Sequence, residues 1–311
     1  MTHAHNPGAP LRDVPLTALV VDDAEVERRA SELEASAAAS TASRVERMLL
    51  ALRCMDLTTL SDDDTDERVR QLCGKAKRPL EADVVEALGG VARGATVGAV
   101  CVFHQFVPAA VEALAGSGIP VAAVAGGFPV GYREPERRAK QVRAAVLAGA
   151  GEIDVVITRA FVHQQRWGDL YDEVRSMRAA SGDARLKVIL STGDLTTLTE
   201  VARAAWVAMA AGADFIKTST GRERVNATIP AGVVMARAIL QYQRETGCVV
   251  GLKPAGGIRT AETALTWLTL VREELDESWL TPSLFRIGAS GLLEDLGREL
   301  AKESRQGATG G

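Results

Sequence analysis

Short apolar runs alternate with longer stretches of mixed polarity along most of the chain. In the longer stretches, apolar residues recur every three or four positions, which is the period of an amphipathic helix. The short runs are rich in Val, Ile, Leu and Ala, as expected of buried strands. The pattern predicts strands at residues 53–56, 97–103, 120–125, 152–157, 186–190, 215–217, 249–253 and 285–287. Helices are expected between them, most clearly at 135–148, 197–211, 231–246 and 261–275.

The order of these elements predicts a closed barrel. A strand followed by a helix, repeated along the chain, implies parallel strands with right-handed crossovers between them. Eight such units favour an α/β fold of the (β/α)8 TIM barrel type over an open, doubly wound sheet. We assign this barrel to residues 51–303.

The two ends of the chain do not follow the repeat. The first ten residues are rich in His, Pro, Gly and Ala and are expected to form a disordered tip, and residues 304–311 are expected to form a flexible tail. Residues 22–52 have a helical period, with an acidic start at Asp22 and an Ala/Ser-rich interruption at 35–43. Residues 1–50 are therefore predicted to be a tip and an N-terminal helical extension that packs onto the barrel.

The composition narrows the functional classes. The chain has 311 residues and a formal net charge of −4, so it lacks the general positive field that would bind a nucleic acid. No apolar run approaches the roughly 20 residues of a membrane-spanning helix. The four cysteines are scattered, which argues against a disulfide framework and suits a reducing cytoplasm. Only four histidines occur, two of them in the first five residues, so we expect neither a metal nor another cofactor.

Two lysines end neighbouring predicted strands. Lys217 closes the segment Ala-Gly-Ala-Asp-Phe-Ile, and Lys253 closes Val-Val-Gly-Leu in the next strand. Adjacent parallel strands lie about 4.8 Å apart, so the two ammonium groups are expected to approach each other. Like charges at short range lower the pKa of a lysine and leave a fraction of neutral amine that can attack a carbonyl. An equally simple interpretation is that Asp154 or Asp214 holds Lys217 for stability.

Asp154, in the fourth predicted strand, supplies a carboxylate. At the barrel mouth it could transfer protons through a water as a carbinolamine and an enamine form. A structural ion pair with either lysine explains this residue equally well. Glu152 lies two positions earlier, so it should point to the same face at greater depth, and we expect it to be structural.

Glycine-rich turns after the last strands suggest a phosphate site. Gly256 and Gly257 follow the seventh strand and Ser290 follows the eighth, and loops at these two places often bind phosphate in such barrels. Gly221 and Arg222 follow the sixth strand and could close the site, with Arg222 as a charged donor. Tight turns and a solvated arginine explain the same residues. The segments lack the phosphate-loop and dinucleotide-binding motifs.

Five segments resemble, in order, the motifs of the deoxyribose-phosphate aldolase family. They are Met-Asp-Leu-Thr-Thr-Leu at 55–60, Glu-Ile-Asp-Val-Val-Ile at 152–157, Gly-Ala-Asp-Phe-Ile-Lys-Thr-Ser-Thr-Gly at 212–221, Lys-Pro-Ala-Gly-Gly-Ile-Arg at 253–259 and Phe-Arg-Ile-Gly-Ala-Ser at 285–290. The resemblance covers about residues 50–300 and is closer to the longer form with an N-terminal extension. The chain departs from the family pattern at Phe103, His104, Ser191, Arg222 and Gly291.

The resemblance implies a class I aldolase without a cofactor that acts on small molecules, a phosphorylated deoxysugar and aldehydes. Lys217 would form a Schiff base with acetaldehyde, and the enamine would add to D-glyceraldehyde 3-phosphate to give 2-deoxy-D-ribose 5-phosphate, with cleavage as the direction in the cell. Lys253 would lower the pKa of Lys217 and join Asp154 in proton transfer. Asp56 and Thr58 would contact the sugar. The phosphate would be held by Gly221, Arg222, Gly256, Gly257 and Ser290. A homodimer is also expected from the resemblance.

Two further interpretations stay open at this point. One is a related lysine-dependent aldolase with a different aldehyde acceptor. The other is a barrel that binds a sugar phosphate without turnover, which would be expected to lack at least one of Lys217, Lys253 and Asp154. The presence of all three favours an enzyme.

Overall fold

The computed structural model describes residues 4–11, 16–40, 42–131 and 134–309 of the chain. Within these residues, eight parallel strands form one sheet in the order β7-β6-β5-β4-β3-β2-β1-β8. Backbone bridges from Leu252 to Phe285 and from Ala255 to Gly288 join β7 to β8, so the sheet closes and the predicted (β/α)8 barrel is confirmed. The strands are β1 Met55–Thr58, β2 Ala99–Phe103, β3 Val121–Ala125, β4 Glu152–Val156, β5 Arg185–Ile189, β6 Phe215–Lys217, β7 Gly251–Lys253 and β8 Ile287–Ala289.

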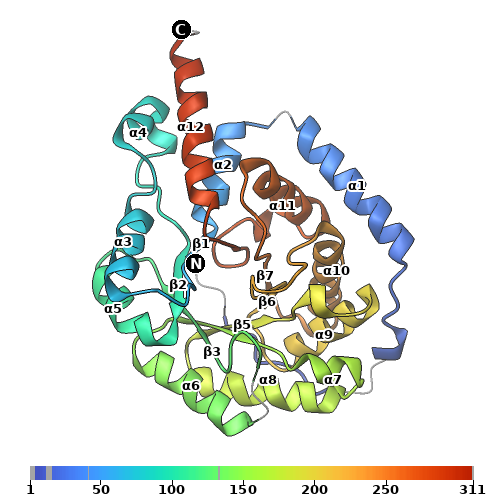
Figure 1. Ribbon diagram of the computed structural model, residues 1–311. Helices are drawn as coiled ribbons and strands as arrows, with labels where there is room; N and C mark the ends of the chain where they lie inside the picture. The colour runs from blue at the N-terminus through green and yellow to red at the C-terminus, as the bar shows by residue number, and fades with distance from the viewer. Residues whose placement is uncertain (1–3, 12–15, 41, 132–133, 310–311) are drawn as a thin grey trace.

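Helices surround the barrel (Figure 1). Several begin at a threonine that caps the first turn: Thr197, Thr228 and Thr260 each accept a hydrogen bond from the backbone N–H three positions on. The helices are α1 Asp23–Ala39, α2 Arg44–Arg53, α3 Asp66–Lys77, α4 Ala82–Leu88, α5 Val107–Ala113, α6 Pro135–Leu147, α7 Arg159–His163, α8 Trp167–Ser181, α9 Leu198–Ala210, α10 Ile229–Thr246, α11 Ala261–Glu274 and α12 Leu292–Thr309.

The first strand begins two residues later than the sequence pattern predicts. Helix α2 continues to Arg53, and the N–H of Cys54 still donates to the carbonyl of Leu50, so the chain is helical where the strand was expected to start. Asp56 consequently lies within β1 rather than at its carboxyl end, and its side chain is buried.

The eighth strand is also shifted by two residues. Pairing with β1 begins at Ile287, which lies opposite Met55, whereas Phe285 only bridges to Leu252 of β7. Ser290 therefore follows the last residue of β8 directly and lies at the mouth of the barrel.

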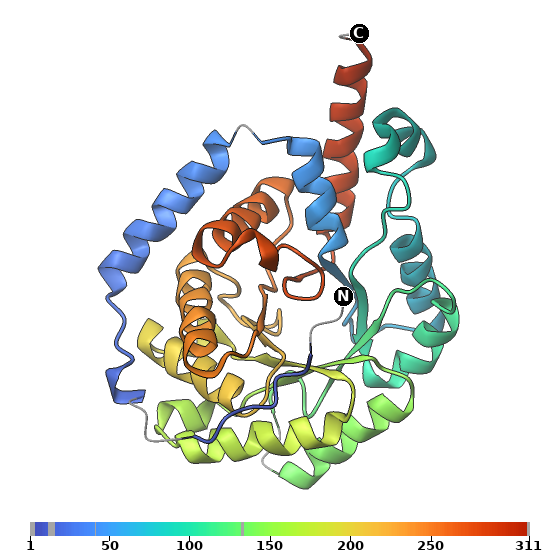
Figure 2. The ribbon, with the colours of Figure 1, turned by 180° about the vertical axis from the view of Figure 1, so that it is seen from behind.

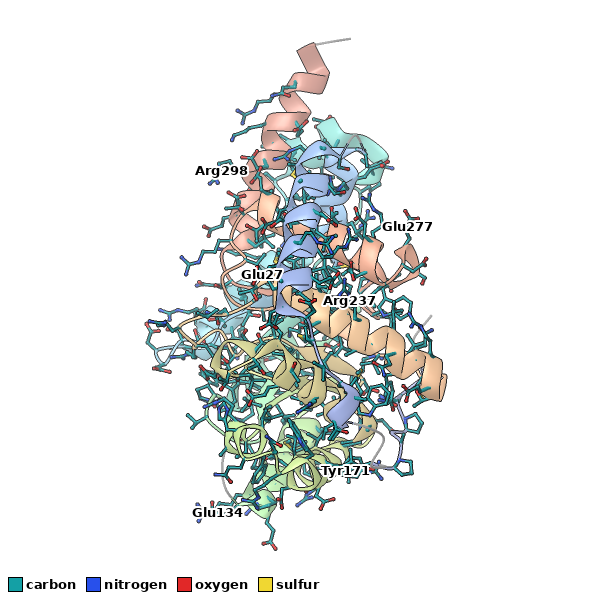
Figure 3. All side chains as sticks on the ribbon, turned by 90° about the vertical axis from the view of Figure 1, so that its right-hand side faces the viewer. Glu27, Glu134, Tyr171, Arg237, Glu277 and Arg298 are labelled. Atoms are coloured by element: carbon teal, nitrogen blue, oxygen red, sulfur yellow. The ribbon has the colours of Figure 1, made fainter. Side chains whose placement is uncertain are left out.

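The N-terminal extension consists of two helices on the outside of the barrel. Helix α1 packs on α10 and α11, and α2 packs on α11 and α12. Arg237 of α10 forms ion pairs with Glu25 of α1 at 2.5 Å and with Glu274 of α11 at 3.1 Å, so it joins three helices on the side seen in Figure 3. Helix α1 ends at Ala39 and α2 begins at Arg44, so α1 ends inside the interruption predicted at 35–43, and residues 35–39 are still helical.

Residues 4–11 are not a loose tip, which corrects the expectation from composition. Asn6 is buried, and its amide donates to the carbonyls of Met209 at 2.7 Å and Ala213 at 2.9 Å. The Oδ1 atom of Asn6 accepts a hydrogen bond from the Tyr242 hydroxyl at 3.1 Å. Figure 2 shows this segment crossing the back of the barrel, on the face opposite the mouth. These bonds give the segment a fixed place that low sequence complexity does not reveal.

The C-terminal helix also passes a predicted boundary. Helix α12 continues to Thr309 instead of giving way to a flexible tail at residue 304, and Ser304 is buried and donates to the carbonyl of Ala301. Residues 1–3 and 310–311, which belong to the predicted tip and tail, lie outside the described residues. In the described part of the chain, no helix is both long and apolar enough to cross a membrane.

Asn6→Ala should destabilise the fold by about 1–3 kcal/mol, because buried polar groups of Met209 and Tyr242 would lose a partner. The free energy of unfolding in urea measures this change. The control is Gln71→Ala, which removes an exposed amide bonded to Glu67 on the same helix and should change stability by less than about 0.5 kcal/mol. Equal effects of the two substitutions would show that the N-terminal segment does not stabilise the barrel.

Candidate active site

Among the described residues, seven charged side chains lie close together inside the barrel, and none is more than 4% exposed. A buried charge is costly unless it is paired, so each of these groups must find a partner within the barrel. We call this set the interior charge cluster. Its members are Asp56 of β1, Glu152 and Asp154 of β4, Lys187 of β5, Lys217 of β6, Lys253 of β7 and Arg286 just before β8.

Asp154 lies at the centre of the interior charge cluster. Its Oδ2 atom accepts hydrogen bonds from Nζ of Lys217 at 2.8 Å and of Lys253 at 2.7 Å, and its Oδ1 atom accepts from Lys187 at 2.9 Å. Burial alone would raise the pKa of Asp154, but the three ammonium groups hold this pKa well below its ordinary value. Asp154 is therefore ionised at neutral pH and contacts both lysines singled out from the sequence.

The two lysines of β6 and β7 lie opposite each other but have different surroundings. Burial lowers the pKa of Lys253, yet Asp154 and a second carboxylate, Asp56 at 2.5 Å, raise it above the ordinary lysine value. Burial also lowers the pKa of Lys217; Asp154 opposes this and Lys253 adds to it, and the net pKa is below the ordinary value. Lys253 therefore keeps its proton, and Lys217 is the lysine that loses its proton more readily.

The charges of the cluster explain why Lys217 favours the neutral form. With every group ionised, the cluster holds four cations and three carboxylates, so one positive charge has no counterpart. An uncompensated buried charge costs several kcal/mol, and loss of the proton from Lys217 balances the cluster. A neutral, buried amine is the form in which a lysine attacks a carbonyl carbon.

A second set of contacts anchors the cluster deeper in the barrel. Lys187 donates to Glu152 at 2.6 Å, and Arg286 binds Glu152 at 2.7 Å and Asp56 at 2.5 Å. Glu152 thus points into the barrel below Asp154 and pairs with two cations, as expected of a structural residue. These contacts connect β1, β4 and β5 with the segment before β8.

Two members of the cluster, Lys187 and Arg286, are not predicted from the sequence as site residues. Lys187 interrupts an apolar strand, which is the same signal that singles out Lys217 at the end of its strand. Arg286 lies in a segment taken for a strand, and only the shift of β8 shows that its side chain turns toward Asp56. A search for every charged residue within apolar runs would have found both.

Asp56 does not line the cavity above Lys217. Its carboxylate is held by Lys253 and Arg286, which together lower its pKa in spite of the burial that would raise it. The contact between Asp56 and a sugar, which the resemblance implies, stays a prediction. Thr58, two residues further along β1, does line the cavity.

A cavity of about 770 Å³ opens above Lys217 at the barrel mouth. The loops after β1, β6, β7 and β8 form its walls, so residues far apart in the sequence meet around one lysine. With Lys217, it brings together six of the residues expected at the substrate: Thr58, Gly221, Arg222, Gly256, Gly257 and Ser290. Asp154 and Lys253 lie beneath the cavity and reach it through their contacts with Lys217 and with each other.

The loop after β7 lines the cavity with the backbone of two glycines, Gly256 and Gly257. Gly256 and Gly257 have backbone φ values of 81° and 82°, which residues other than glycine rarely adopt. A Cβ atom on Gly256 would lie 2.5 Å from Oδ1 of Asn226, so the turn also has no room for one. The two glycines are thus required by the geometry of this wall.

The loop after β6 is occupied by a carboxylate of its own chain. The backbone N–H groups of Thr220, Gly221 and Arg222 donate to Glu223 at distances from 2.9 to 3.2 Å. The Arg222 guanidinium donates to the carbonyl of Leu60 at 2.6 Å, on the opposite wall. Gly221 and Arg222 therefore line the cavity as expected, but their donors are engaged within the chain, and Glu223 is not predicted from the sequence.

Asp214, the alternative partner considered for Lys217, lies at the opposite end of the barrel. Its carboxylate accepts from Arg178 at 2.6 Å and from the backbone N–H of Asn6 at 2.9 Å, so the proposed pair with Lys217 is wrong. Among the described residues, no group of three or more His, Cys, Asp or Glu could hold a metal ion. All four cysteines are free thiols.

Comparison with known proteins finds relatives along nearly the whole chain. The model of the DeoC/LacD family aldolases matches residues 49–293. The chain is 50% identical to the deoxyribose-phosphate aldolase of Mus musculus and 49% identical to that of Homo sapiens, in each case over 299 residues, 96% of this chain and 94% of the relative.

Solved structures agree with this result. The crystal structure of a candidate deoxyribose-phosphate aldolase from Toxoplasma gondii matches with a TM-score of 0.70 at 25% identity, over 83% of this chain and 95% of that one. A corresponding protein from Coccidioides immitis matches with a TM-score of 0.67 at 25% identity, over 90% and 99% of the two chains.

Lys187→Met should lower the free energy of unfolding by about 3–5 kcal/mol, because Glu152 and Asp154 would each lose a buried partner. Denaturant unfolding measures the loss. Lys75→Met is the control: Lys75 is exposed and 3.9 Å from Glu294, and its replacement should change stability by less than about 1 kcal/mol. If Lys187→Met were as mild as the control, Lys187 would not support the cluster.

Proposed function

The chain belongs to the DeoC/LacD family of aldolases, and on this premise we propose that it cleaves 2-deoxy-D-ribose 5-phosphate reversibly to acetaldehyde and D-glyceraldehyde 3-phosphate. Lys217 is the proposed nucleophile. The observation that carries this assignment is a buried lysine with a lowered pKa that lines the cavity at the barrel mouth. Lys253 does not combine these properties, because its pKa is raised and it lies beneath the cavity.

In the proposed reaction, the neutral Nζ of Lys217 attacks C1 of the open-chain sugar. The carbinolamine loses water and becomes a protonated Schiff base. A base takes the proton of the 3-hydroxyl, the C2–C3 bond breaks, and its electron pair moves into the C=N group to form an enamine. This step releases D-glyceraldehyde 3-phosphate. Protonation of the enamine at C2, followed by hydrolysis, releases acetaldehyde and restores Lys217.

Asp154 and Lys253 are suited to the proton transfers and the charge changes of this sequence. Asp154 is 2.8 Å from Nζ of Lys217, where its negative charge stabilises the positive Schiff base. Lys253 keeps its proton and shares Asp154 with Lys217, so it can supply a proton when the carbinolamine loses water. A water in the cavity above would connect these groups to the substrate.

The outer end of the cavity is suited to the phosphate. Gly256 and Gly257 present backbone there, and Ser290 adds an exposed hydroxyl from the loop after β8. Backbone N–H groups in such turns bind anions without a strongly basic surface, in keeping with the net charge of −4. Thr58 lies on the wall of β1 and offers a hydroxyl to the sugar.

Two expectations from the sequence stay predictions. A homodimer is expected from the resemblance to the family. A cytoplasmic location is expected from the cysteine pattern, and the four free thiols are compatible with it.

The proposed function is tested by incubating the protein with acetaldehyde, reducing it with borohydride, and mapping the modified peptide by mass spectrometry, together with an assay of 2-deoxy-D-ribose 5-phosphate cleavage. An ethyl group on Lys217 and cleavage activity are expected. An adduct without cleavage would indicate a lysine aldolase with another aldehyde acceptor. Absence of any adduct would favour a barrel that binds a sugar phosphate without turnover.

Lys217→Leu should abolish the adduct and turnover and leave the fold intact, because Asp154 keeps Lys187 and Lys253 as partners. Circular dichroism and the cleavage assay measure both properties. The control Lys75→Leu, at an exposed site, should keep full activity. Substantial cleavage by Lys217→Leu would remove Lys217 from the mechanism.

Lys253→Leu should raise the pKa of Lys217, because one repulsive charge is lost and Asp154 stays to favour the protonated amine. At a given pH, less Lys217 is then neutral, so the rising limb of the profile of kcat/KM against pH should move to higher pH. A rise of about one pKa unit would lower activity at neutral pH about tenfold. An unmoved rising limb would contradict this role of Lys253.

A further inference from the structure

The loop after β6 binds a carboxylate of its own chain in an arrangement suited to an anion. Both carboxylate oxygens of Glu223 accept from the N–H of Thr220, at 2.9 and 3.0 Å, and Oε2 also accepts from the Thr220 hydroxyl at 2.7 Å. The N–H groups of Gly221 and Arg222 donate to the same oxygen at 3.0 and 3.2 Å. Three consecutive N–H groups and one hydroxyl thus converge on one negatively charged group.

Such a run of backbone donors is a nest, the kind of site in which proteins bind phosphate. This nest, at residues 220–222, lines the same cavity as Lys217 and the glycine turn after β7. Glu223 therefore fills a position that a phosphate group of a ligand in the cavity could also take. Burial would raise the pKa of Glu223, but the hydrogen bonds from Thr220 lower it below the ordinary value, so the occupant is a carboxylate at neutral pH.

The side chain of Arg222 is engaged in the same way. Its guanidinium donates to the carbonyl of Leu60 at 2.6 Å and to Asp62 at 3.1 Å across the cavity, and both of these residues belong to the loop after β1. Arg222 and Asp62 are exposed, so this pair is weak and can exchange. The cationic and the neutral donors of this wall are thus satisfied by the chain itself.

We propose that Glu223 is a resident competitor for the phosphate: its carboxylate occupies the nest of residues 220–222 in the empty protein, and the substrate phosphate displaces it. This inference rests on the proposed function for the identity of the substrate. A phosphate dianion and a carboxylate repel each other and cannot share one set of donors, so entry of one requires departure of the other. The phosphate carries more charge and more acceptor oxygens than the carboxylate, and Arg222 adds a cation to its side.

The surroundings allow Glu223 to move. Its side chain is only half-buried, and the hydroxyl of Ser191 in the loop after β5 also lowers the pKa of this carboxylate. The two loops are in close contact, because a Cβ atom on Gly193 would lie 1.9 Å from the carbonyl oxygen of Val225. In the loop after β5, the Thr192 hydroxyl is buried and has no hydrogen-bond partner among the described residues. A displaced carboxylate can turn toward this loop.

The test is a calorimetric titration of the full chain with inorganic phosphate, at a pH where phosphate is a dianion. Glu223→Gln keeps the shape of the side chain and removes its charge, so the Kd for phosphate should fall roughly tenfold. The matched control is Glu27→Gln, which removes one negative charge from the exposed face of α1, where Figure 3 labels Glu27. This control should bind phosphate as the unmodified protein does.

A second variant, Glu223→Ala, and a second measurement, the KM of the cleavage assay, test the same displacement. Glu223→Ala removes the occupant entirely and should bind phosphate at least as tightly as Glu223→Gln, with thermal unfolding as the check on its fold. In the cleavage assay, the KM for 2-deoxy-D-ribose 5-phosphate should fall with the Kd for phosphate.

Weaker phosphate binding by both variants would show that Glu223 supports the loop, and unchanged binding would show that it does not compete; either result overturns the proposal. So does a failure of phosphate to bind any form of the protein. Because the titration needs no turnover, tighter binding without cleavage would leave this inference standing and reject the proposed reaction instead.

Discussion

One buried carboxylate determines the chemistry of the barrel interior. Asp154 holds the ammonium groups of Lys187, Lys217 and Lys253 within 2.9 Å, and these three lysines come from three consecutive strands. Without this carboxylate, three buried cations would face one another with no negative charge between them. With it, ion pairs between β4 and the three lysine-bearing strands help to fix the register of these strands. The cluster has one carboxylate fewer than cations, and Lys217, which has the fewest carboxylate partners, is the lysine that most readily loses its proton. Reactivity at Lys217 is therefore a property of the whole cluster rather than of a single neighbour.

The two ends of the barrel use polar groups differently. At the end of the barrel opposite the mouth, Arg286 and Glu152 form an ion pair. The Asn6 amide donates hydrogen bonds to two backbone carbonyls at this end. At the mouth, hydroxyls such as those of Thr192 and Ser219 are buried without a partner among the residues that the structure describes. Other donors at the mouth are paired, since the N–H groups of residues 220–222 all donate to Glu223. The unpaired hydroxyls of the described residues are thus found above the reacting lysine, and the fully paired charges below it.

Much of this architecture is already present in the sequence, because periodicity and buried charge are local signals. The alternation of short apolar runs with amphipathic stretches predicts the barrel, and lysines that end apolar strands mark Lys217 and Lys253. What is missed depends on which atoms meet across the fold. Nothing local shows that Arg286 turns toward Asp56, or that Glu223, an ordinary loop glutamate in the sequence, folds back onto three backbone N–H groups. Asn6 is hidden for the same reason, since its partners lie more than 200 residues away.

These long-range contacts have a consequence for the order in which the chain is synthesised. Helix α1 is synthesised long before α10 and α11, on which it packs, and β1 long before β8, with which it pairs, so both segments find these partners only late in translation. Until then, the apolar face of α1 and the edge of β1 have nothing native to cover them. Contacts of this span slow folding and expose the nascent chain to aggregation. Nascent-chain folding of this protein is thus expected to finish only after most of the chain has left the ribosome tunnel.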